Sequence, residues 1–485
     1  MIVLAPIVAA AAGGLLAFLP DRRARLRSIG QVGAAALAAV STLFLLGRAA
    51  TGGVAQVQAP SFLPPLTLQL RAEPAGALFA AVVAGLWTLA TVQAVVHLRG
   101  EPTARRFFLA WFATLAALTG VAYAADLLTL LVAYEAFSLL TYLLIVQERT
   151  PRAFAAGTRY LVYVLAGGSA VLAGVLIVFA SGVPLAFAPG GVGIGAAGAP
   201  AVVAFVAFVA GFGVKAALMP LHGWVAEAHP AAPAPVSALL SGVMVAAGGW
   251  GLLRVVHGTF GVEALARLGL LTPFAALAAV TVLAAALLAT REPDLKRRLA
   301  YSTVSQMGYW TLAIALAGPV VTAAGLVHLV HHAFLKGALF FCAGVWIHVA
   351  GARRLDELRG MGRRTPWTAA AFTLAALSMM GVPPLSGFVA KWWLGVGMLQ
   401  DGAPWALAVL LLGALLAAAY LLPVVHALYL EAPTEVPVRA RPPLALVVPA
   451  VAAAATALVF GLAGHLPGFP LDLAERAVVA LTGGG

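Results

Sequence analysis

The stretch Gly211-Phe-Gly-Val-Lys215-Ala-Ala-Leu-Met-Pro220-Leu-His222 places a lysine near the middle of an otherwise apolar helix pattern. Holding a charge at the centre of a bilayer costs ~2.5–3.5 kcal/mol, so such a side chain is expected to face a partner or a water-filled path. Pro220 removes a backbone donor and clashes with the preceding turn, which leaves carbonyl groups that must line a cavity rather than lipid. A lysine beside a helix break, followed by His222 and His229, therefore predicts an ion pathway.

Composition places this pathway in a membrane protein. The 485 residues are 62% hydrophobic and 9% charged, and the mean hydropathy is +1.01, whereas about a quarter of residues are charged in soluble domains. The formal charge of +12 does not indicate nucleic-acid binding, because the basic residues lie between apolar segments and act as topology signals. With Cys342 as the single cysteine, we expect no disulfide, no metal, haem or other cofactor, and no catalytic centre in the chain itself.

Apolar windows of about 20 residues predict an all-α polytopic membrane protein with about fourteen transmembrane helices. The windows are 2–19, 28–50, 75–98, 105–124, 126–146, 157–182, 201–221, 233–256, 271–290, 300–317, 319–349, 368–398, 403–429 and 443–463. Two of them, 319–349 and 368–398, exceed one membrane thickness, which indicates tilt, a break or extramembrane turns. We expect loops over 51–74 and 181–200, each with room for a short hairpin.

Most lysine and arginine residues lie in the loops that follow odd-numbered helices in this count. The positive-inside rule makes those loops cytoplasmic, so both termini are predicted on the non-cytoplasmic side of a cell inner (plasma) membrane. Lys296 falls in one of these loops. The other lysines, Lys215, Lys336 and Lys391, fall inside predicted helices, which ordinary surface use of lysine does not explain.

A buried carboxylate is the first candidate partner for Lys215. Glu135 lies inside the apolar segment Leu127–Ile145, and an opposite charge nearby favours the protonated lysine while desolvation disfavours it. A movable Glu135–Lys215 pair can therefore switch the lysine between holding and releasing a proton. A structural carboxylate bonded to Ser138 or Thr141 is the alternative.

A histidine and lysine cluster is the second candidate. His328, His332 and Lys336 are spaced so that they lie along one helical face. Two histidines at this spacing can bind a metal, but the sequence offers no second ligand cluster, so we expect no metal site. A proton relay fits better, because imidazole titrates near neutral pH and either ring nitrogen can carry the proton. Hydrogen-bonded core histidines are the alternative.

A second helix break precedes Lys391. Pro383 and Pro384 interrupt the apolar pattern there, which repeats the arrangement of Lys215 and Pro220. We therefore expect two inverted repeats of about five helices each, helices 4–8 and 9–13, with helices 7 and 12 broken. The predicted divisions are an N-terminal three-helix segment, two half-channels, and a C-terminal helix with a short tail, at residues 1–104, 105–256, 271–429 and 443–485.

Four stretches resemble a known family: Lys215-Ala-Ala-Leu-Met-Pro-Leu-His222, Ala228-His-Pro-Ala-Ala-Pro-Ala-Pro-Val-Ser237, Asp294-Leu-Lys-Arg-Arg-Leu-Ala-Tyr301 and Gly381-Val-Pro-Pro-Leu-Ser-Gly-Phe-Val-Ala-Lys391. They resemble the antiporter-like proton-channel subunits, which include the antiporter-like membrane subunits of respiratory complex I, their counterparts in membrane-bound hydrogenases, and the D-type subunits of Mrp-type cation/proton antiporters. The resemblance implies a proton path along a central axis.

On that axis the resemblance places Glu135, Lys215, His328, His332, Lys336 and Lys391, and we add His222 and His229 beside the first break. One position departs from the family pattern, because Ala246 stands where many members have a lysine. Water held beside the small residues from Ala246 to Gly249, the side chain of Trp250, or a histidine would have to bridge that gap.

The leading hypothesis is a proton-translocating subunit of a multi-subunit membrane complex, such as the translocase NADH-quinone oxidoreductase or a related hydrogenase, whose chemistry lies on partner subunits. The alternatives are a D-type component of a stand-alone sodium/proton antiporter, the membrane subunit of an energy-coupled inorganic-carbon uptake system, and a structural spacer with a lapsed channel. The expected partners are other integral membrane subunits, related antiporter-like subunits among them, together with the lipid bilayer and protons or sodium.

Overall fold

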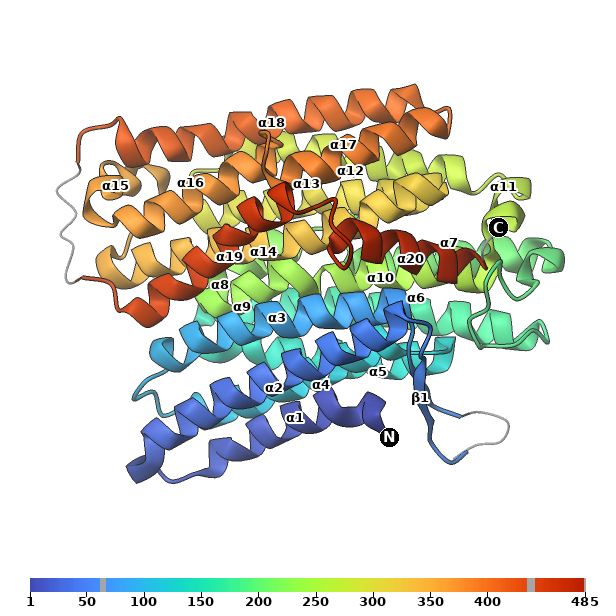
Figure 1. Cartoon of the computed structure of the whole chain (residues 1–485), viewed down its shortest axis with the longest axis horizontal. Coiled ribbons are helices and arrows are strands. Elements are labelled where there is room, and N and C mark those ends of the chain that lie inside the picture. Colours follow the sequence, from blue (N-terminus) through green and yellow to red (C-terminus); the bar gives the residue numbers. More distant parts are fainter. Residues whose placement is uncertain (62–66, 434–440, 484–485) are drawn as a thin grey trace.

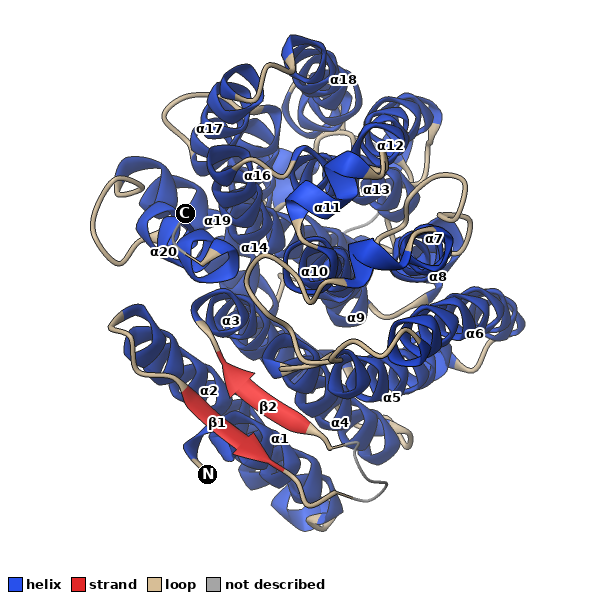
Figure 2. Cartoon of the chain, turned by 90° about the vertical axis from the view of Figure 1, so that its right-hand side faces the viewer, coloured by secondary structure: helices blue, strands red, loops and turns tan. Residues whose placement is uncertain are grey.

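The computed structural model describes residues 1–61, 67–433 and 441–483. Its helices run side by side in one bundle (Figure 1), which Figure 2 shows end-on. Ten of the described helices are long and apolar enough to cross a membrane, and three shorter apolar helices accompany them at Ile2–Phe18, Ala199–Lys215 and Pro366–Met380. The predicted all-α polytopic membrane fold is confirmed, whereas the count of about fourteen helices and the inverted repeats stay predictions.

The N-terminal half contains α1 (Ala5–Leu15), α2 (Ala24–Ala50), α3 (Pro74–His97), α4 (Ala104–Tyr123), α5 (Leu127–Ile145), α6 (Pro151–Ala180), α7 (Ala199–Lys215), α8 (Val225–Ala231), α9 (Ala234–Leu239), the π-helical turn η6 (Leu240–Met244), α10 (Ala246–Arg254), the π-helical turn η7 (Val255–Phe260) and α11 (Val262–Arg267). The C-terminal half contains α12 (Leu271–Arg291), α13 (Leu295–Leu316), α14 (Pro319–Ala350), α15 (Met361–Arg364), α16 (Pro366–Met380), α17 (Ser386–Gln400), α18 (Pro404–Tyr429), α19 (Leu444–Leu462) and α20 (Pro470–Thr482).

The helix starts follow ordinary capping chemistry. Proline occupies the first turn of α3, α6, α14 and α18, where its missing N–H costs no hydrogen bond. Asp126, Thr150 and Asp294 accept a hydrogen bond from the first-turn N–H groups of α5, α6 and α13. These caps fix where the membrane helices begin.

Two irregular segments close one end of the bundle. Strands β1 (Ala55–Gln58) and β2 (Gln69–Ala72) form an antiparallel hairpin, which the 51–74 loop was expected to have room for; residues 62–66 of that loop lie outside the described residues. The loop after α6 is held by hydrogen bonds from Leu127 N–H to Leu185 C=O (2.9 Å) and from Ala188 N–H to Gly258 C=O (3.0 Å). The chain ends and α11 lie toward this end, whereas α15 lies at the other (Figure 1).

The centre of the bundle is built around α10, α13 and α14, and α2, α6 and α18 lie at its periphery (Figure 2). The span that contains α10 is wholly buried, whereas large apolar side chains of the peripheral helices are exposed, such as Leu37, Leu176 and Leu415. Exposed leucine over most of a helix suits lipid or a partner membrane subunit. Ionisable groups on the central helices are therefore shielded from lipid.

Of the two long windows, 319–349 forms the single unbroken helix α14, whereas 368–398 is divided into α16 and α17 around Gly381. The first break differs from our expectation. Lys215 is the last residue of α7, not a residue near the middle of a helix over 201–221. The physical reason is Pro220, whose missing N–H and restricted predecessor prevent the helix from continuing through the following turn.

Candidate functional site

Lys215 lies in a cage of aromatic side chains. It is fully buried, and its ammonium donates a hydrogen bond to the hydroxyl of Tyr160 over 2.6 Å. The same nitrogen lies 4.1 Å from the ring centre of Phe137 and 5.9 Å from that of Trp224. The negative faces of aromatic rings stabilise a cation in a dry setting, so this cage can hold a protonated lysine without a direct counter-ion. The sequence analysis missed these aromatic residues because they come from separate helices.

Glu135 is half-buried and lines a groove of about 420 Å³ between α5 and α6. In the part of the chain that the structure describes, no ion pair joins it to Lys215, whose ammonium donates instead to Tyr160. The two charges interact at longer range, and the movable Glu135–Lys215 pair stays a prediction. The alternative is not found either, because Oε1 of Glu135 has no hydrogen-bond partner among the described residues.

Two hydrogen bonds hold the turn after Lys215. The indole N–H of Trp224 donates to the carbonyl of Val214 (2.8 Å), and the N–H of Met219 donates to the hydroxyl of Thr281 on α12 (3.1 Å). Pro220 lies in this turn, as expected for a helix break. His222 is half-buried there, with its ring 6.4 Å from that of Tyr301. The break is thus a fixed turn rather than a loose one.

His229 connects the first break with α14. It is fully buried on α8, and its ring stacks on Phe340 of α14 with the centres 5.1 Å apart. It lies within electrostatic range of Lys336 and of Lys296. Lys296 is also buried, and its ammonium donates to the carbonyl of Ala232 over 2.6 Å. We expected Lys296 in a cytoplasmic loop, whereas it lies in the first turn of α13 with its side chain buried.

The face predicted on α14 is present. The rings of His328 and His332 are 5.9 Å apart, and Lys336 follows one turn later. The ammonium of Lys336 donates to the hydroxyl of Ser302 (2.5 Å) and to the carbonyl of Leu299 (3.2 Å), both on α13. In the described part of the chain both ring nitrogens of His332 lack hydrogen-bond partners, so this imidazole is free to exchange protons.

A polar face of α13, missed from the sequence, lies against these groups. The backbone carbonyl oxygen of Gln306 is 3.2 Å from Nε2 of His328, and the centre of the Tyr309 ring is 5.8 Å from the centre of the His328 ring. The ammonium of Lys391 lies 5.8 Å from the centre of the same Tyr309 ring. The signal was available, because Ser302, Gln306 and Tyr309 recur at helical spacing.

The second break places Lys391 beside a freed carbonyl. Gly381 ends α16 with φ +93°, a conformation that favours glycine, and Pro383 and Pro384 follow in the turn. Lys391 is buried, and its ammonium donates to the carbonyl of Met379 over 2.7 Å. The lysine also lines a mostly apolar groove of about 430 Å³ between α17 and α18.

The helix around Ala246, where the family's lysine is missing, packs more tightly against its neighbours than we expected. A side chain at Gly248 would collide with the backbone of Ala216, and one at Gly249 would collide with the indole of Trp310. These glycines therefore serve close helix packing and leave no room for water beside them, contrary to our expectation. Trp250 does not bridge the gap either, because its N–H donates to the carbonyl of Val121.

A different contact joins the two halves of the chain. The hydroxyls of Ser241 on η6 and Thr303 on α13 are 2.6 Å apart. Thr303 is adjacent to Ser302, which accepts the hydrogen bond of Lys336. Together with His229, which packs on α14, this hydroxyl pair connects the first half of the chain with α13 and α14 through polar side chains.

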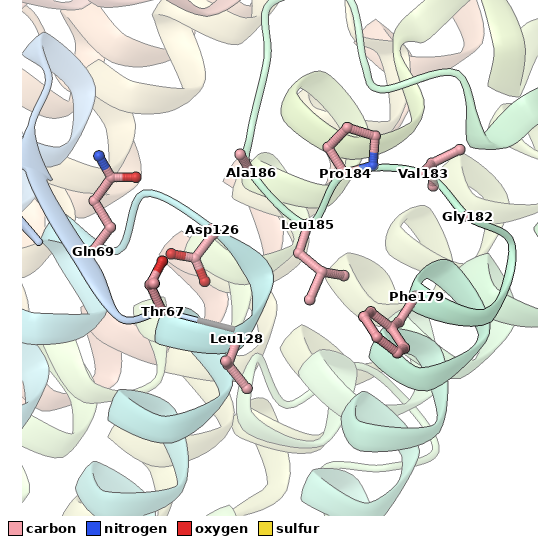
Figure 3. Close-up of a pocket in the computed structure, with 10 residues that line it drawn as sticks. All are labelled: Thr67, Gln69, Asp126, Leu128, Phe179, Gly182, Val183, Pro184, Leu185 and Ala186. Atoms are coloured by element: carbon pink, nitrogen blue, oxygen red, sulfur yellow. The ribbon is translucent and has the colours of Figure 1, made fainter. Parts of the chain in front are cut away.

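A cavity of about 580 Å³ lies apart from these lysines and histidines. Figure 3 shows Asp126 on one wall, with Leu185 and Phe179 opposite. Asp126 caps α5 through Thr129, and burial raises the pKa of its carboxyl while the hydrogen bonds from Thr129 oppose that shift. Among the described residues, no group of three His, Cys, Asp or Glu side chains could hold a metal ion.

Comparison with known proteins shows the family to which this chain is related. Residues 124–417 match the family described as NADH:quinone oxidoreductase/Mrp antiporter, transmembrane. NADH-quinone oxidoreductase subunit N of Desulforudis audaxviator is 35% identical over 386 residues, which cover 79% of this chain and 76% of that protein. Hydrogenase-4 component B of Escherichia coli is 32% identical over 68% of this chain, but the match spans only 52% of that protein.

The fold is also similar to a solved structure. A chain of the Mrp complex from Dietzia sp. superposes with a TM-score of 0.89 at 25% sequence identity, and the alignment covers 99% of this chain and 97% of that one. The likeness extends beyond the matched segment 124–417, so it includes the N-terminal helices and the helices after α18.

Proposed function

The chain belongs to the NADH:quinone oxidoreductase/Mrp antiporter family of transmembrane proteins, and from this membership we propose that it is a proton-translocating subunit of a multi-subunit membrane complex. It is a multi-pass membrane protein, and we place it in the cell inner (plasma) membrane with both termini on the non-cytoplasmic side. The arginine-rich turns before α2 and α4 and around α15 lie at the opposite end of the bundle from the hairpin, which supports that orientation (Figure 1).

One observation carries the proposal: in the described part of the chain, buried lysines and histidines follow one another across the bundle with no carboxylate partner within ion-pair distance. Lys215, Lys336 and Lys391 each donate to a neutral hydroxyl or carbonyl oxygen. A lysine that is held by neutral acceptors in a dry interior releases its proton more readily than one in an ion pair. Such lysines suit proton transfer better than structural bracing.

The roles follow from position. Lys215 receives a proton in its aromatic cage, and Glu135 sets how strongly the proton is held through the longer-range attraction between the two charges. His222 and His229 lead from the first break toward α14, where Lys336, His332 and His328 continue the relay. Tyr309 lies between His328 and Lys391, and Lys391 is the last lysine of the relay. The helix breaks at Pro220 and at Pro383 and Pro384 supply the carbonyl groups that orient these side chains.

The two segments 105–256 and 271–429 are proposed as two half-channels. The first contains Lys215 at the end of α7, and the second contains Lys391 after the break between α16 and α17. The contact between Ser241 and Thr303 and the stacking of His229 on Phe340 support a transfer between them. Ala246, where a lysine was expected, is then bypassed rather than bridged.

The partners are proposed to be other integral membrane subunits, related antiporter-like subunits among them. The relatives with redox names support coupling to chemistry on those partners. A second candidate is a D-type component of a cation/proton antiporter, and the near-complete superposition on a chain of the Mrp complex favours it. In that case sodium would be exchanged for protons.

The experiment that tests the proposal uses the complex purified from its own membranes. The co-purifying subunits are identified, the complex is reconstituted in vesicles, and proton movement is followed with and without sodium. Proton movement driven by a redox substrate supports the leading proposal, whereas movement driven only by a sodium gradient supports the second candidate. Vesicles that move no protons under either condition contradict both.

A further inference from the structure

A cavity of about 500 Å³ opens at the end of the bundle that carries α11. Its wall is formed by η7, the glycine-rich loop before α7, the turn between α13 and α14, and the end of α20. His257 of η7 lines this cavity and is only 2% exposed. Its Nε2 has no hydrogen-bond partner among the described residues. Buried polar groups are almost always bonded, and a polar cavity of this size has room for ordered water.

Further polar atoms without partners lie on α13 and α14. In the described part of the chain, the hydroxyls of Thr311 and Thr322 have no hydrogen-bond partner. Thr311 lies on α13, and Thr322 lies in the first turn of α14. In most helices a threonine hydroxyl bonds to the carbonyl one turn earlier, as Thr303 does here with Leu299. These two threonines do not, so their hydroxyls are available to water.

The position of these atoms links the cavity to the relay. Ala317, directly after α13, lines the cavity. Along α14, Thr322 lies about 9 Å from His328, at 1.5 Å of rise per residue. The unpartnered atoms therefore occupy the space between the histidine cluster and the end of the bundle opposite the arginine-rich turns.

We propose that this cavity is a water-filled vestibule through which protons exchange with the outside, with His257 as the exchanging group and water held by Thr311 and Thr322 as its connection to His328. The inference rests on the proton translocation proposed above. A neutral imidazole accepts a proton at one ring nitrogen and releases one from the other, so the transfer leaves the side chain unchanged. The route runs along α13 and α14 and is separate from the groove at Lys391.

The charged groups around His257 suit such an exchange. Arg254, one turn earlier, forms an ion pair with Glu73 over 2.6 Å, but Glu73 also pairs with Arg71, so one carboxylate is shared by two positive charges. On the rim, Glu263 and Arg267 of α11 are exposed and 3.8 Å apart. The remaining positive charge of Arg254 opposes a lasting positive charge on His257, so a proton accepted there is passed on rather than held.

Cysteine labelling tests the vestibule without any transport measurement. Cys342 is the single cysteine and is buried, so Cys342→Ala gives a background for His257→Cys. Val255→Cys is the matched control, because Val255 is buried on the same turn and does not line the cavity. A membrane-impermeant thiol reagent is applied to vesicles of each orientation. We expect labelling of His257→Cys from the side opposite the arginine-rich turns only, and no labelling of Val255→Cys. Absence of labelling at position 257 would overturn the proposal.

Proton flux in the assembled complex then tests the route. We expect His257→Gln to lower flux at least ~10-fold, as for other lost proton-transfer groups, and the isosteric double variant Thr311→Val/Thr322→Val to lower it as well. Thr456→Val is the control, because the Thr456 hydroxyl bonds to its own helix on α19. Normal flux in both test variants would contradict the vestibule while leaving the proposed function intact. A wild-type complex that moves no protons would instead remove the proposed function.

Discussion

The ammonium of Lys215 donates to the hydroxyl of Tyr160 over 2.6 Å, and that hydroxyl donates in turn to the carbonyl of Ser138 over 2.9 Å. Tyr160 thus takes the hydrogen bond that a direct ion pair with Glu135 would use. A neutral acceptor holds a proton on lysine less firmly than a carboxylate does, so this geometry favours release. Glu135 is left to act at longer range from the groove between α5 and α6.

Tyr160→Phe should lower proton flux while the fold is kept. The change removes one hydrogen bond to a charged group, worth about 1.5–3 kcal/mol, so the flux should fall by roughly 10-fold to 100-fold if the bond positions the lysine for transfer. Tyr142→Phe on α5 is the control, since no described hydrogen bond of Tyr142 is lost. The measurement is the initial rate of proton movement in vesicles at equal protein content, and equal rates for both variants would exclude a role for Tyr160.

Glu135→Gln and Lys215→Met should impair flux in a non-additive way. If Glu135 works only by tuning Lys215, then removing the lysine leaves the carboxylate nothing to tune, and the double variant should be no worse than Lys215→Met. Initial rates for the two single variants and the double variant give the answer. A double variant that loses the product of the two single effects would show that the residues act separately.

The ionisable residues could be found from the sequence because a charge in an apolar helix is costly and therefore conspicuous. Glu135, Lys215, Lys336 and Lys391 stood out in this way. Their neighbours did not, since Tyr160 and Ser302 are ordinary residues in helices and matter only because the fold brings them to a lysine. Gly248 and Gly249 misled us for the same reason, because small residues allow either water or close packing and only the neighbouring helices decide which.

Ser241→Ala and Thr303→Val should each reduce transfer between the two halves. Each variant removes one member of the hydroxyl pair that spans η6 and α13. Thr303→Val leaves the buried Ser241 hydroxyl without its described partner, which costs about 1–3 kcal/mol, whereas in Ser241→Ala the Thr303 hydroxyl still donates to the carbonyl of Leu299. A loss of stability should therefore accompany the loss of flux mainly in Thr303→Val. Flux and thermal unfolding are both measured. The double variant Ser241→Ala/Thr303→Val separates the effects, because it removes both hydroxyls: flux should stay low while stability partly recovers, and full recovery of flux would exclude a transfer role.

Asp126→Asn should remove a pH dependence of stability. Burial raises the pKa of the Asp126 carboxyl in the folded protein, so the stabilising effect of its protonation is present below the unfolded pKa and is lost as the pH rises through the folded pKa. Asparagine keeps the cap without the charge, so it should unfold at the same or a higher temperature at neutral pH. Asp126→Ala loses the cap and should be less stable by about 0.5–2 kcal/mol. Thermal unfolding from about pH 3, below the usual pKa of aspartate of about 3.9, up to about pH 8 gives the comparison, and parallel curves for wild type and Asp126→Asn would count against the titration of this group.

The central claim is that buried lysines carry protons rather than merely supply positive charge, and Lys391 tests it most directly. Its ammonium is held by the carbonyl of Met379 beside the second helix break. Arginine effectively never releases its proton, whereas a buried glutamate can carry one in its neutral form. The measurement is proton flux at equal protein content for Lys391→Arg, Lys391→Glu and Lys391→Ala in the assembled complex. The account predicts that the arginine and alanine variants lose flux and that the glutamate variant retains part of it; wild-type flux in Lys391→Arg would contradict the account.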